Sequence, residues 1–97
     1  MKSKFHLEAM IEFDEAGDFY SVRSEELGER FRSHIQSSIE EIEDSPHSWP
    51  MFDQDVRRYV VDEFPFVIIY MELEDLVLIV AVMHTSRKPG YWRSRIN

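Results

Sequence analysis

The stretch FPFVIIYMELEDLVLIVAVMHTSRKPGYWRSR, from Phe64 to Arg95, decides how this chain folds. It holds two runs rich in Val, Ile and other large apolar residues, Phe66 to Met71 and Leu76 to Met83, which suit the pleated surface of a β-sheet. The polar segment 72–75 between them has the length of a hairpin turn. The sequence therefore predicts a central pair of antiparallel strands.

Both faces of this strand pair are apolar. Phe66, Ile68 and Tyr70 alternate with Val67 and Ile69, and the second run repeats the pattern. A strand pair that is apolar on both sides needs cover on both sides. One layer of helices covers only one face, so we expect a second chain, either a partner protein or another copy of this one, to bury the other face or its edge.

Two helices are predicted before these strands. From Leu7 onward, apolar residues recur every three or four positions, which is the period of an amphipathic helix. Ser24 is a suitable N-cap for a second helix that ends before Pro46. The two helices would form an antiparallel hairpin with one apolar face. The expected inward residues are Leu7, Met10, Phe13, Ala16 and Tyr20 in the first helix and Leu27, Phe31, Ile35, Ile39 and Ile42 in the second.

Shorter patterns indicate the remaining elements. Lys2 to His6 is a short candidate edge strand, and Val56 to Val61 is predicted to be a strand that ends at a polar turn. Segment 45–55 has no periodicity and contains prolines, so it is predicted to be a loop. The predicted fold is one α+β domain over residues 1–97, with the order β-αα-βββ and the helix hairpin packed on one face of an antiparallel sheet.

Charge is divided unevenly along the chain. The net charge is −8, and residues 1–55 carry 14 of the 19 acidic residues but only 5 of the 11 basic ones. After His84 there are four cations and no acidic side chain. Long-range repulsion opposes the binding of such a protein to nucleic acid, so any recognition of an anion has to be local.

Several classes of protein are disfavoured by what the sequence lacks. It has no cysteine, which excludes a disulfide framework and fits the reducing cytoplasm. The N-terminus has no signal-peptide core, and the apolar runs are too short to cross a bilayer as helices. No cluster of metal ligands and no glycine-rich phosphate loop is present. We expect a cytoplasmic protein without a metal, a cofactor or a membrane association.

A cationic and aromatic cluster follows the last long strand, which ends at His84. RNA cleavage through the 2′-hydroxyl needs an acid, a base and cations at the phosphate; histidine and tyrosine can transfer the protons, and arginine binds the phosphate oxygens. Neighbouring strand residues point to opposite faces, so only one of Arg57 and Arg58 can join such a site. The candidate catalytic residues of a metal-independent nuclease are His84, Arg57, Arg87 and Tyr91.

The same segment also has a structural and a binding interpretation. Arg93 and Arg95 can pair with acids of the helical half, and Tyr91 and Trp92 can close the core. Arginines beside an interface can equally pair with acids of a partner. The candidate residues for contact with a target or partner are Arg58, Lys88, Trp92, Arg93 and Arg95.

Taken together, several segments resemble toxins of the RelE/ParE superfamily of bacterial type II toxin–antitoxin modules, most of all the ParE-like plasmid stabilisation branch. The most specific are Val56-Arg57-Arg58, Phe64-Pro65-Phe66 with Tyr70, and the ending from His84 to Arg95. The resemblance covers Phe5 to Arg95 and implies the same β-αα-βββ order. It also implies a growth-inhibiting toxin around which a cognate antitoxin wraps.

This superfamily divides in mechanism. RelE-like members cleave mRNA on the ribosome, whereas ParE-like members inhibit DNA gyrase without cutting RNA. The present chain has few lysines and an acidic balance, which disfavours its approach to the anionic ribosome. We therefore expect gyrase inhibition first, ribosome-dependent mRNA cleavage as the alternative, and a non-toxic interaction module third. Whether the chain is an enzyme stays open at this point.

Overall fold

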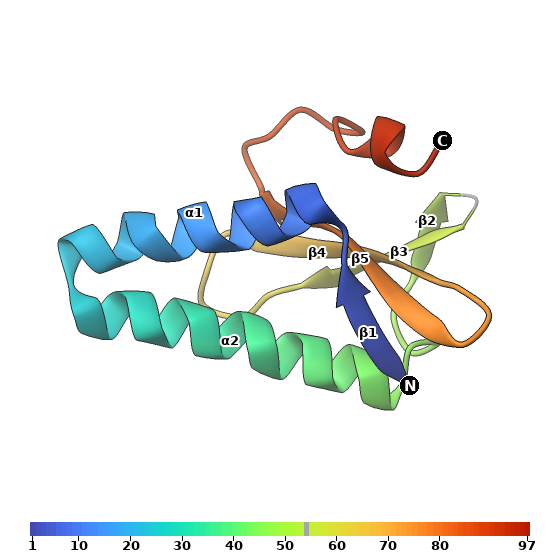
Figure 1. Ribbon diagram of the computed structural model, residues 1–97, viewed down its shortest axis with the longest axis horizontal. Coiled ribbons are helices and arrows are strands. Elements are labelled where there is room, and N and C mark those ends of the chain that lie inside the picture. The colour runs from blue at the N-terminus through green and yellow to red at the C-terminus, as the bar shows by residue number, and fades with distance from the viewer. Residues whose placement is uncertain (54) are drawn as a thin grey trace.

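The computed structural model describes residues 1–53 and 55–97 and has an α+β fold, with a helix hairpin beside a sheet (Figure 1). The predicted fold class is confirmed, with one short strand added before the last three. In chain order the elements are β1 (Lys2–Phe5), α1 (Leu7–Arg23), α2 (Glu25–Asp44), β2 (Met51–Asp53), β3 (Val56–Val60), β4 (Phe66–Glu72), β5 (Leu76–His84) and the 3₁₀ helix η1 (Arg93–Arg95).

The sheet has the strand order β1-β5-β4-β3-β2, so the predicted central pair does lie in its middle. The strands β2 to β5 pair antiparallel, whereas β1 is parallel to β5, and the sheet is therefore mixed. A β-bulge interrupts the pairing of β4 with β5: Ile69 lies opposite Ala81 and Tyr70 opposite Ile79, which leaves Val80 as the extra residue. The bulge allows Val80 and Ala81 both to join the core on the second face.

The prediction of a loop over 45–55 is wrong at residues 51–53, because β2 lies there and pairs with β3, and residue 54 lies outside the described residues. A strand of three residues is too short to show an alternating pattern in the sequence. Trp49 packs its ring against Tyr59, with 4.9 Å between the centroids. Met51 and Phe52 remain 52% and 45% exposed, so the segment is held mainly by backbone pairing and by Trp49.

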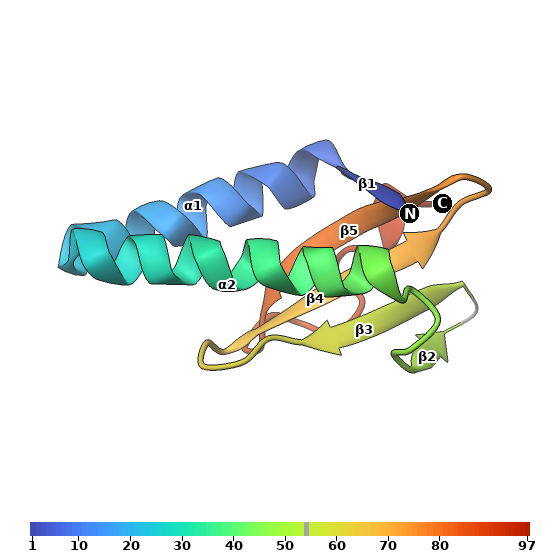
Figure 2. The same cartoon turned by 90° about the horizontal axis from the view of Figure 1, so that it is seen from below.

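The helix hairpin turns at Ser24. The Ser24 hydroxyl accepts a hydrogen bond from the N–H of Leu27 at 3.2 Å and so caps α2, as predicted. Gly28 allows the two helices to approach closely, because a Cβ atom on it would lie 2.0 Å from the hydroxyl oxygen of Ser21. Figure 2 shows the helices running side by side in opposite directions along the sheet.

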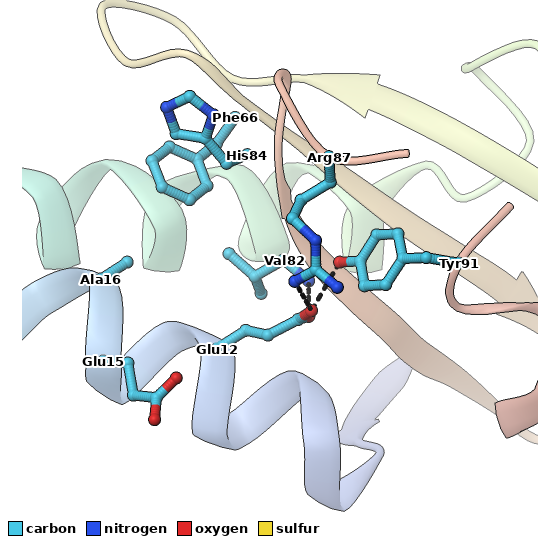
Figure 3. Close-up of a pocket in the computed structure, with 8 residues that line it drawn as sticks. All are labelled: Glu12, Glu15, Ala16, Phe66, Val82, His84, Arg87 and Tyr91. Atoms are coloured by element: carbon cyan, nitrogen blue, oxygen red, sulfur yellow. Dashed lines mark hydrogen bonds and ion pairs between the residues drawn. The ribbon is translucent and has the colours of Figure 1, made fainter. Parts of the chain in front are cut away.

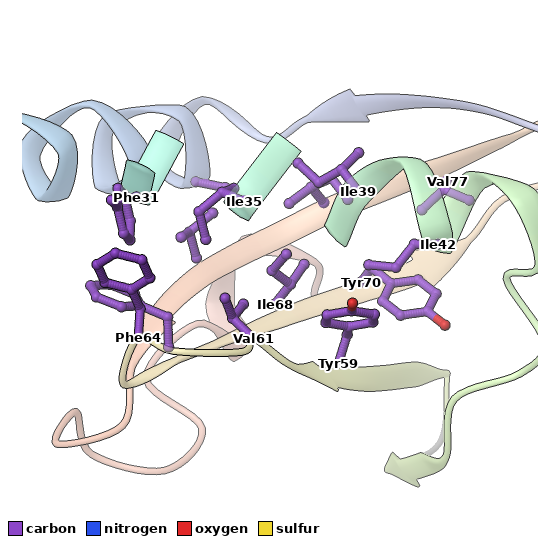
Figure 4. Close-up of a cluster of buried hydrophobic side chains, with 14 residues drawn as sticks. Phe31, Ile35, Ile39, Ile42, Tyr59, Val61, Phe64, Ile68, Tyr70 and Val77 are labelled. Atoms are coloured by element: carbon purple, nitrogen blue, oxygen red, sulfur yellow. The ribbon is translucent and has the colours of Figure 1, made fainter. Parts of the chain in front are cut away.

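The predicted stripe of α2 forms the centre of the main core (Figure 4). Phe31, Ile35 and Ile42 have no exposed surface. They pack against the side of the sheet that carries Ile68 and Tyr70. The Tyr70 hydroxyl donates to the backbone carbonyl of Pro46 at 2.6 Å, so this buried hydroxyl has a hydrogen-bond partner inside the core.

For α1, the predicted inward stripe is wrong in its first turns. Leu7 is 73% exposed and Met10 is 39% exposed, whereas Ala9 is fully buried. Phe13 and Tyr20 do pack against the main core. This helix has apolar residues on both its inner and its outer side, so the period of its sequence fits more than one rotation about the helix axis.

The expectation that another chain buries the second face of the sheet is also wrong. The C-terminal segment covers this face: Trp92 is 1% exposed and packs in a cluster with Val67 and Val80, extended by Tyr91. Gly90 lies in the turn that brings Trp92 onto the sheet, and its φ of +77° is one that residues with a side chain rarely adopt. The apolar side chains on both faces of the central strands β4 and β5 are thus covered by other parts of the same chain.

Candidate functional site

Three of the predicted catalytic residues, His84, Arg87 and Tyr91, line one hollow of about 220 Å³ (Figure 3). The hollow lies between α1 and the end of β5, and α1 contributes Glu12 and Glu15. Its remaining wall residues are Ala16, Phe66 and Val82.

Glu12 belongs to this site because β5 has an open edge there. The register of β1 with β5 ends at Ile79, so no strand among the described residues pairs with the backbone of β5 beyond that residue on that side. The N–H of Val82 donates to Oε1 of Glu12 at 3.0 Å, and the carbonyl of Val80 accepts from Nη1 of Arg95 at 3.0 Å. Two side chains therefore satisfy backbone groups that β1 leaves unpaired.

The same carboxylate holds the C-terminal segment. Arg95 donates from Nη1 and Nη2 to the two oxygens of Glu12, at 3.0 and 2.9 Å. The Tyr91 hydroxyl donates to Oε2 at 2.5 Å, and Nη1 of Arg87 lies 3.9 Å from that oxygen. The side chains of Glu12 and Arg95 are 14% and 7% exposed, so this ion pair is shielded from solvent.

Reasoning from the sequence misses Glu12. The segment that forms α1 contains five acidic residues, and the apolar period assigns all of them to the polar side of the helix. The one available signal is complementary charge, because the segment after His84 holds four cations and no acid. That signal predicts that ion pairs form, but it does not select the carboxylate.

The surroundings of Tyr91 keep its hydroxyl protonated. Burial raises the pKa of Tyr91, and the hydrogen bond to Glu12 and the charge of that carboxylate raise it further. The guanidinium groups of Arg95 and Arg87 oppose this rise to a smaller extent. The hydrogen bond to Glu12 is also the main reason that the pKa of Arg95 is raised. Tyr91 is thus a hydrogen-bond donor and a poor base at neutral pH.

His84 is oriented by Ser86. Nδ1 of His84 accepts a hydrogen bond from the Ser86 N–H at 3.0 Å and lies 2.7 Å from the Ser86 hydroxyl oxygen. A ring nitrogen that accepts from an N–H carries no hydrogen, so the neutral imidazole has its hydrogen on Nε2. The ring packs edge-on against Phe66, at 5.2 Å between centroids. It does not face the Glu12 carboxylate (Figure 3). Nε2 of the neutral ring is therefore a donor and not a base.

Arg57, the fourth predicted catalytic residue, lies elsewhere. Its Nε donates to Oε1 of Glu72 at 3.2 Å, and its Nη1 donates to the carbonyl of Trp49 at 2.7 Å. These contacts hold it away from the hollow that His84 lines. Its neighbour Arg58 points to the opposite face and lines a second hollow, as the alternation of a strand requires.

Of the five residues predicted to contact a partner, two are buried in the chain itself. Trp92 is part of the core on the second face, and Arg95 is held by α1. Arg93 lies over the Trp92 ring at 4.8 Å and forms an ion pair with β2. Lys88 and Arg58 are exposed. These two, with the outer part of Arg93, are the residues of the set that reach the surface.

Within residues 1–53 and 55–97, no group of three or more histidine or acidic side chains is arranged to hold a metal ion. Over the same ranges, no helix has the length and apolar content needed to cross a bilayer. What the hollow presents is hydrogen-bond donors, from His84 and Arg87, around a carboxylate whose oxygens are already engaged.

A family model places the chain among the toxins of type II toxin–antitoxin systems. The chain belongs to the family described as the ParE toxin of the type II toxin–antitoxin system parDE, which matches residues 4–89. A chain in the solved structure of the chromosomal ParDE system from P. aeruginosa shares the fold, with a TM-score of 0.64 and 18% identity over 87% of this chain and 95% of that chain. No curated protein matches at a significant level. The resemblance to the ParE branch is therefore confirmed.

Proposed function

We propose that this ParE-family toxin arrests growth by binding DNA gyrase, and that a cognate antitoxin neutralises it. The observation that carries the proposal is the match to the ParE toxin family over residues 4–89. The geometry of the hollow supports a protein that acts by contact over one that cuts RNA.

RNA cleavage through the 2′-hydroxyl requires a base beside that oxygen. The Tyr91 hydroxyl keeps its proton and donates it in a hydrogen bond to Glu12. In the neutral His84 ring, the lone pair of Nδ1 accepts a hydrogen bond from the Ser86 N–H. Neither group is ready to remove a proton. Arg57, which would have supplied a further cation for the phosphate, is paired with Glu72. A net charge of −8 also opposes approach to the polyanionic ribosome, a barrier that a protein target does not impose to the same degree.

For the antitoxin, the outer side of α1 offers a contact surface. Leu7, Ile11 and Val22 are exposed and are spaced by four and eleven residues, which aligns them along one side of a helix. A row of exposed apolar side chains usually marks an interface. We place the antitoxin contact here, because Trp92 already covers the second face of the sheet. Replacing Leu7 and Val22 by glutamate should abolish rescue by the antitoxin and leave toxicity intact.

Controlled expression with two readouts tests the gyrase proposal. Plasmid DNA should lose negative supercoiling while ribosome-bound mRNA stays intact. His84→Gln should arrest growth as the wild type does, because no proton transfer is needed, and His47→Gln is the matched control on an exposed loop. Codon-specific mRNA cuts that disappear in His84→Gln would assign the ribosome-dependent nuclease instead. Unchanged growth on expression of soluble protein would assign a non-toxic homologue.

A further inference from the structure

The outer side of α1 carries exposed apolar side chains along almost its whole length. Leu7, Ile11 and Val22 are 73%, 45% and 88% exposed. At about 100° of rotation per residue, these three lie within one sector of about 60° around the helix axis. From Leu7 to Val22 the row measures about 22 Å at the rise of an α-helix. Figure 2 shows α1 at the margin of the molecule with α2 beside it, so an elongated partner can reach the row.

Acidic side chains frame this row. Asp14 and Glu15 follow on its two sides and Asp18 lies within it, and all three are exposed. Asp18 pairs with Arg32 at 3.1 Å, whereas no ion pair to Asp14 or Glu15 occurs among the described residues. The one basic residue of α1, Arg23, lies in its last turn. The outer side of α1 is therefore apolar and negative, and two of its carboxylates are open to a partner's cations.

We propose that this side of α1 binds an amphipathic helix of a partner protein, with lysine or arginine residues beside its apolar row. Apolar side chains of that helix pack between Leu7, Ile11 and Val22, and its cations pair with Asp14 and Glu15. Charge complementarity carries the choice of a basic partner, because a row framed by acids repels an acidic one. The inference deepens the proposed antitoxin contact and rests on it for the identity of the partner, but not for the chemistry of the surface.

An extended segment fits this surface less well than a helix. The backbone N–H and C=O groups of a strand need partners, which a neighbouring strand normally supplies. The backbone groups in the middle of α1 are already paired within the helix, so α1 has none to offer. A helix satisfies its own backbone, and about 15 residues of helix match the length of the row.

A second copy of this chain is the other candidate occupant, and its charges oppose the contact. If two α1 helices packed antiparallel with Leu7 opposite Val22, Asp14 would lie opposite Glu15 at the centre of the contact. If they packed parallel and in register, each acid would face its own copy. Like charges that meet across an interface are strongly unfavourable. This favours a different protein as the source of the helix.

The test is fluorescence anisotropy with the purified chain and a labelled synthetic helix of about 18 residues, which has leucines at intervals of four and eleven and lysines on both sides of them. We expect saturable binding that weakens at least about tenfold when the lysines are replaced by glutamates, because several ion pairs become repulsive contacts. Replacing the leucines by serines should also weaken it. Circular dichroism should show the peptide gaining helix on binding, because an isolated helix of this length is marginal in water.

Matched double variants separate this surface from the bulk charge. Asp14→Asn with Glu15→Gln should weaken binding about fivefold, because two exposed ion pairs are lost, and added salt should reduce that difference. Glu29→Gln with Glu40→Gln removes the same number of charges from exposed positions of α2. This control should bind the lysine helix as the wild type does.

The location is checked by NMR chemical-shift changes, expected for the backbone amides of Ile11, Glu15 and Val22. The proposal is overturned if the lysine helix does not bind, if the glutamate helix binds as tightly, or if the two double variants behave alike. Self-association of the chain that Val22→Ser abolishes, without binding of the lysine helix, would assign the surface to a second copy and also overturn it. Gyrase is absent from this assay, so failure of the gyrase proposal would leave these results unchanged.

Discussion

At Glu12 a single carboxylate accepts hydrogen bonds from the Val82 N–H, the Tyr91 hydroxyl and the Arg95 guanidinium. These donors come from the edge of β5 and from the C-terminal segment, so one residue of α1 ties together parts of the chain that are far apart in sequence. Removing one member of a shielded charge pair leaves the other desolvated and unpaired, and this costs more than the pair itself contributes.

Glu12→Ala should lower the free energy of unfolding by about 3–5 kcal/mol, because Arg95 would stay shielded without its partner. Urea denaturation measures this. Glu15→Ala, one turn away and exposed, is the control and should change stability by less than about 0.5 kcal/mol. Equal, small effects of the two substitutions would mean that the C-terminal segment is held in another way.

Another residue-scale feature is the charge on His34. Its Nδ1 lies 2.9 Å from the carbonyl oxygen of Arg30 and its Nε2 lies 2.8 Å from a carboxylate oxygen of Glu63. Both partners only accept hydrogen bonds, so the imidazolium, which donates from both ring nitrogens, is the form of the ring that satisfies both contacts. The bond to the Arg30 carbonyl is the main cause that raises the pKa of His34 from 6.5; burial opposes it, and Glu63 adds to it.

A raised folded-state pKa makes stability depend on pH in a defined direction. The contribution of His34 is fully present below its ordinary pKa of 6.5 and is lost as the pH rises through the higher folded-state value. We expect the wild type to be more stable than His34→Gln at about pH 5.5, with the difference shrinking as the pH rises. Denaturant melts across this range measure it, and a difference that stays constant with pH would contradict the assignment.

At the scale of elements, the two helices show what an apolar period determines. The α2 stripe is predicted correctly, because its polar side holds almost no apolar residue. In α1 the outward Leu7 and Val22 are apolar as well, so the apolar period fits two orientations of the helix about its axis. Only packing against the sheet selects one of them. The candidate site shows a similar limit. Closeness in sequence explains why one hollow is lined by His84, Arg87 and Tyr91. The position of the Arg57 side chain is set instead by the face of the strand on which it lies and by its ion pair with Glu72.

The close approach of the helices gives a prediction that opposes helix propensity. Alanine normally stabilises a helix relative to glycine. Gly28→Ala should nevertheless destabilise the protein by about 1–3 kcal/mol, because its Cβ would meet Ser21, including the Ser21 Cα at 3.0 Å. In Gly17→Ala the obstacle is the end of the Arg32 side chain, which can move, so this control should cost less. Thermal melts that rank the two variants in the opposite order would contradict the packing of the hairpin.

At the scale of the whole molecule, the chain covers both faces of its sheet, with helices on one and the C-terminal segment on the other. The apolar pattern of the strands predicts that both faces need cover, but it does not identify the segment that covers each face. Read as sequence, Tyr91 and Trp92 can close the core, but nothing in the pattern tells that they cover the second face of the sheet. Trp92 alone supplies a large apolar surface, while Arg95 pairs with Glu12 at the margin.

Trp92→Ala should therefore uncover the second face. We expect a loss of about 3–5 kcal/mol in the free energy of unfolding, together with binding of a hydrophobic dye, because a large buried ring is removed. Phe52→Ala, which removes an exposed ring near the same face, is the control and should have a small effect. A stable variant that binds no dye would mean that the face is covered by something other than Trp92.

The most direct test of the proposed function is a supercoiling assay with purified DNA gyrase, run beside a reconstituted translation reaction that reports mRNA cleavage. Wild type and His84→Gln should inhibit supercoiling at the same concentrations, and both should leave the mRNA intact, because neither Tyr91 nor His84 is set up as a base. Full gyrase activity in the presence of the folded protein, with mRNA cut by the wild type and not by His84→Gln, would contradict this account.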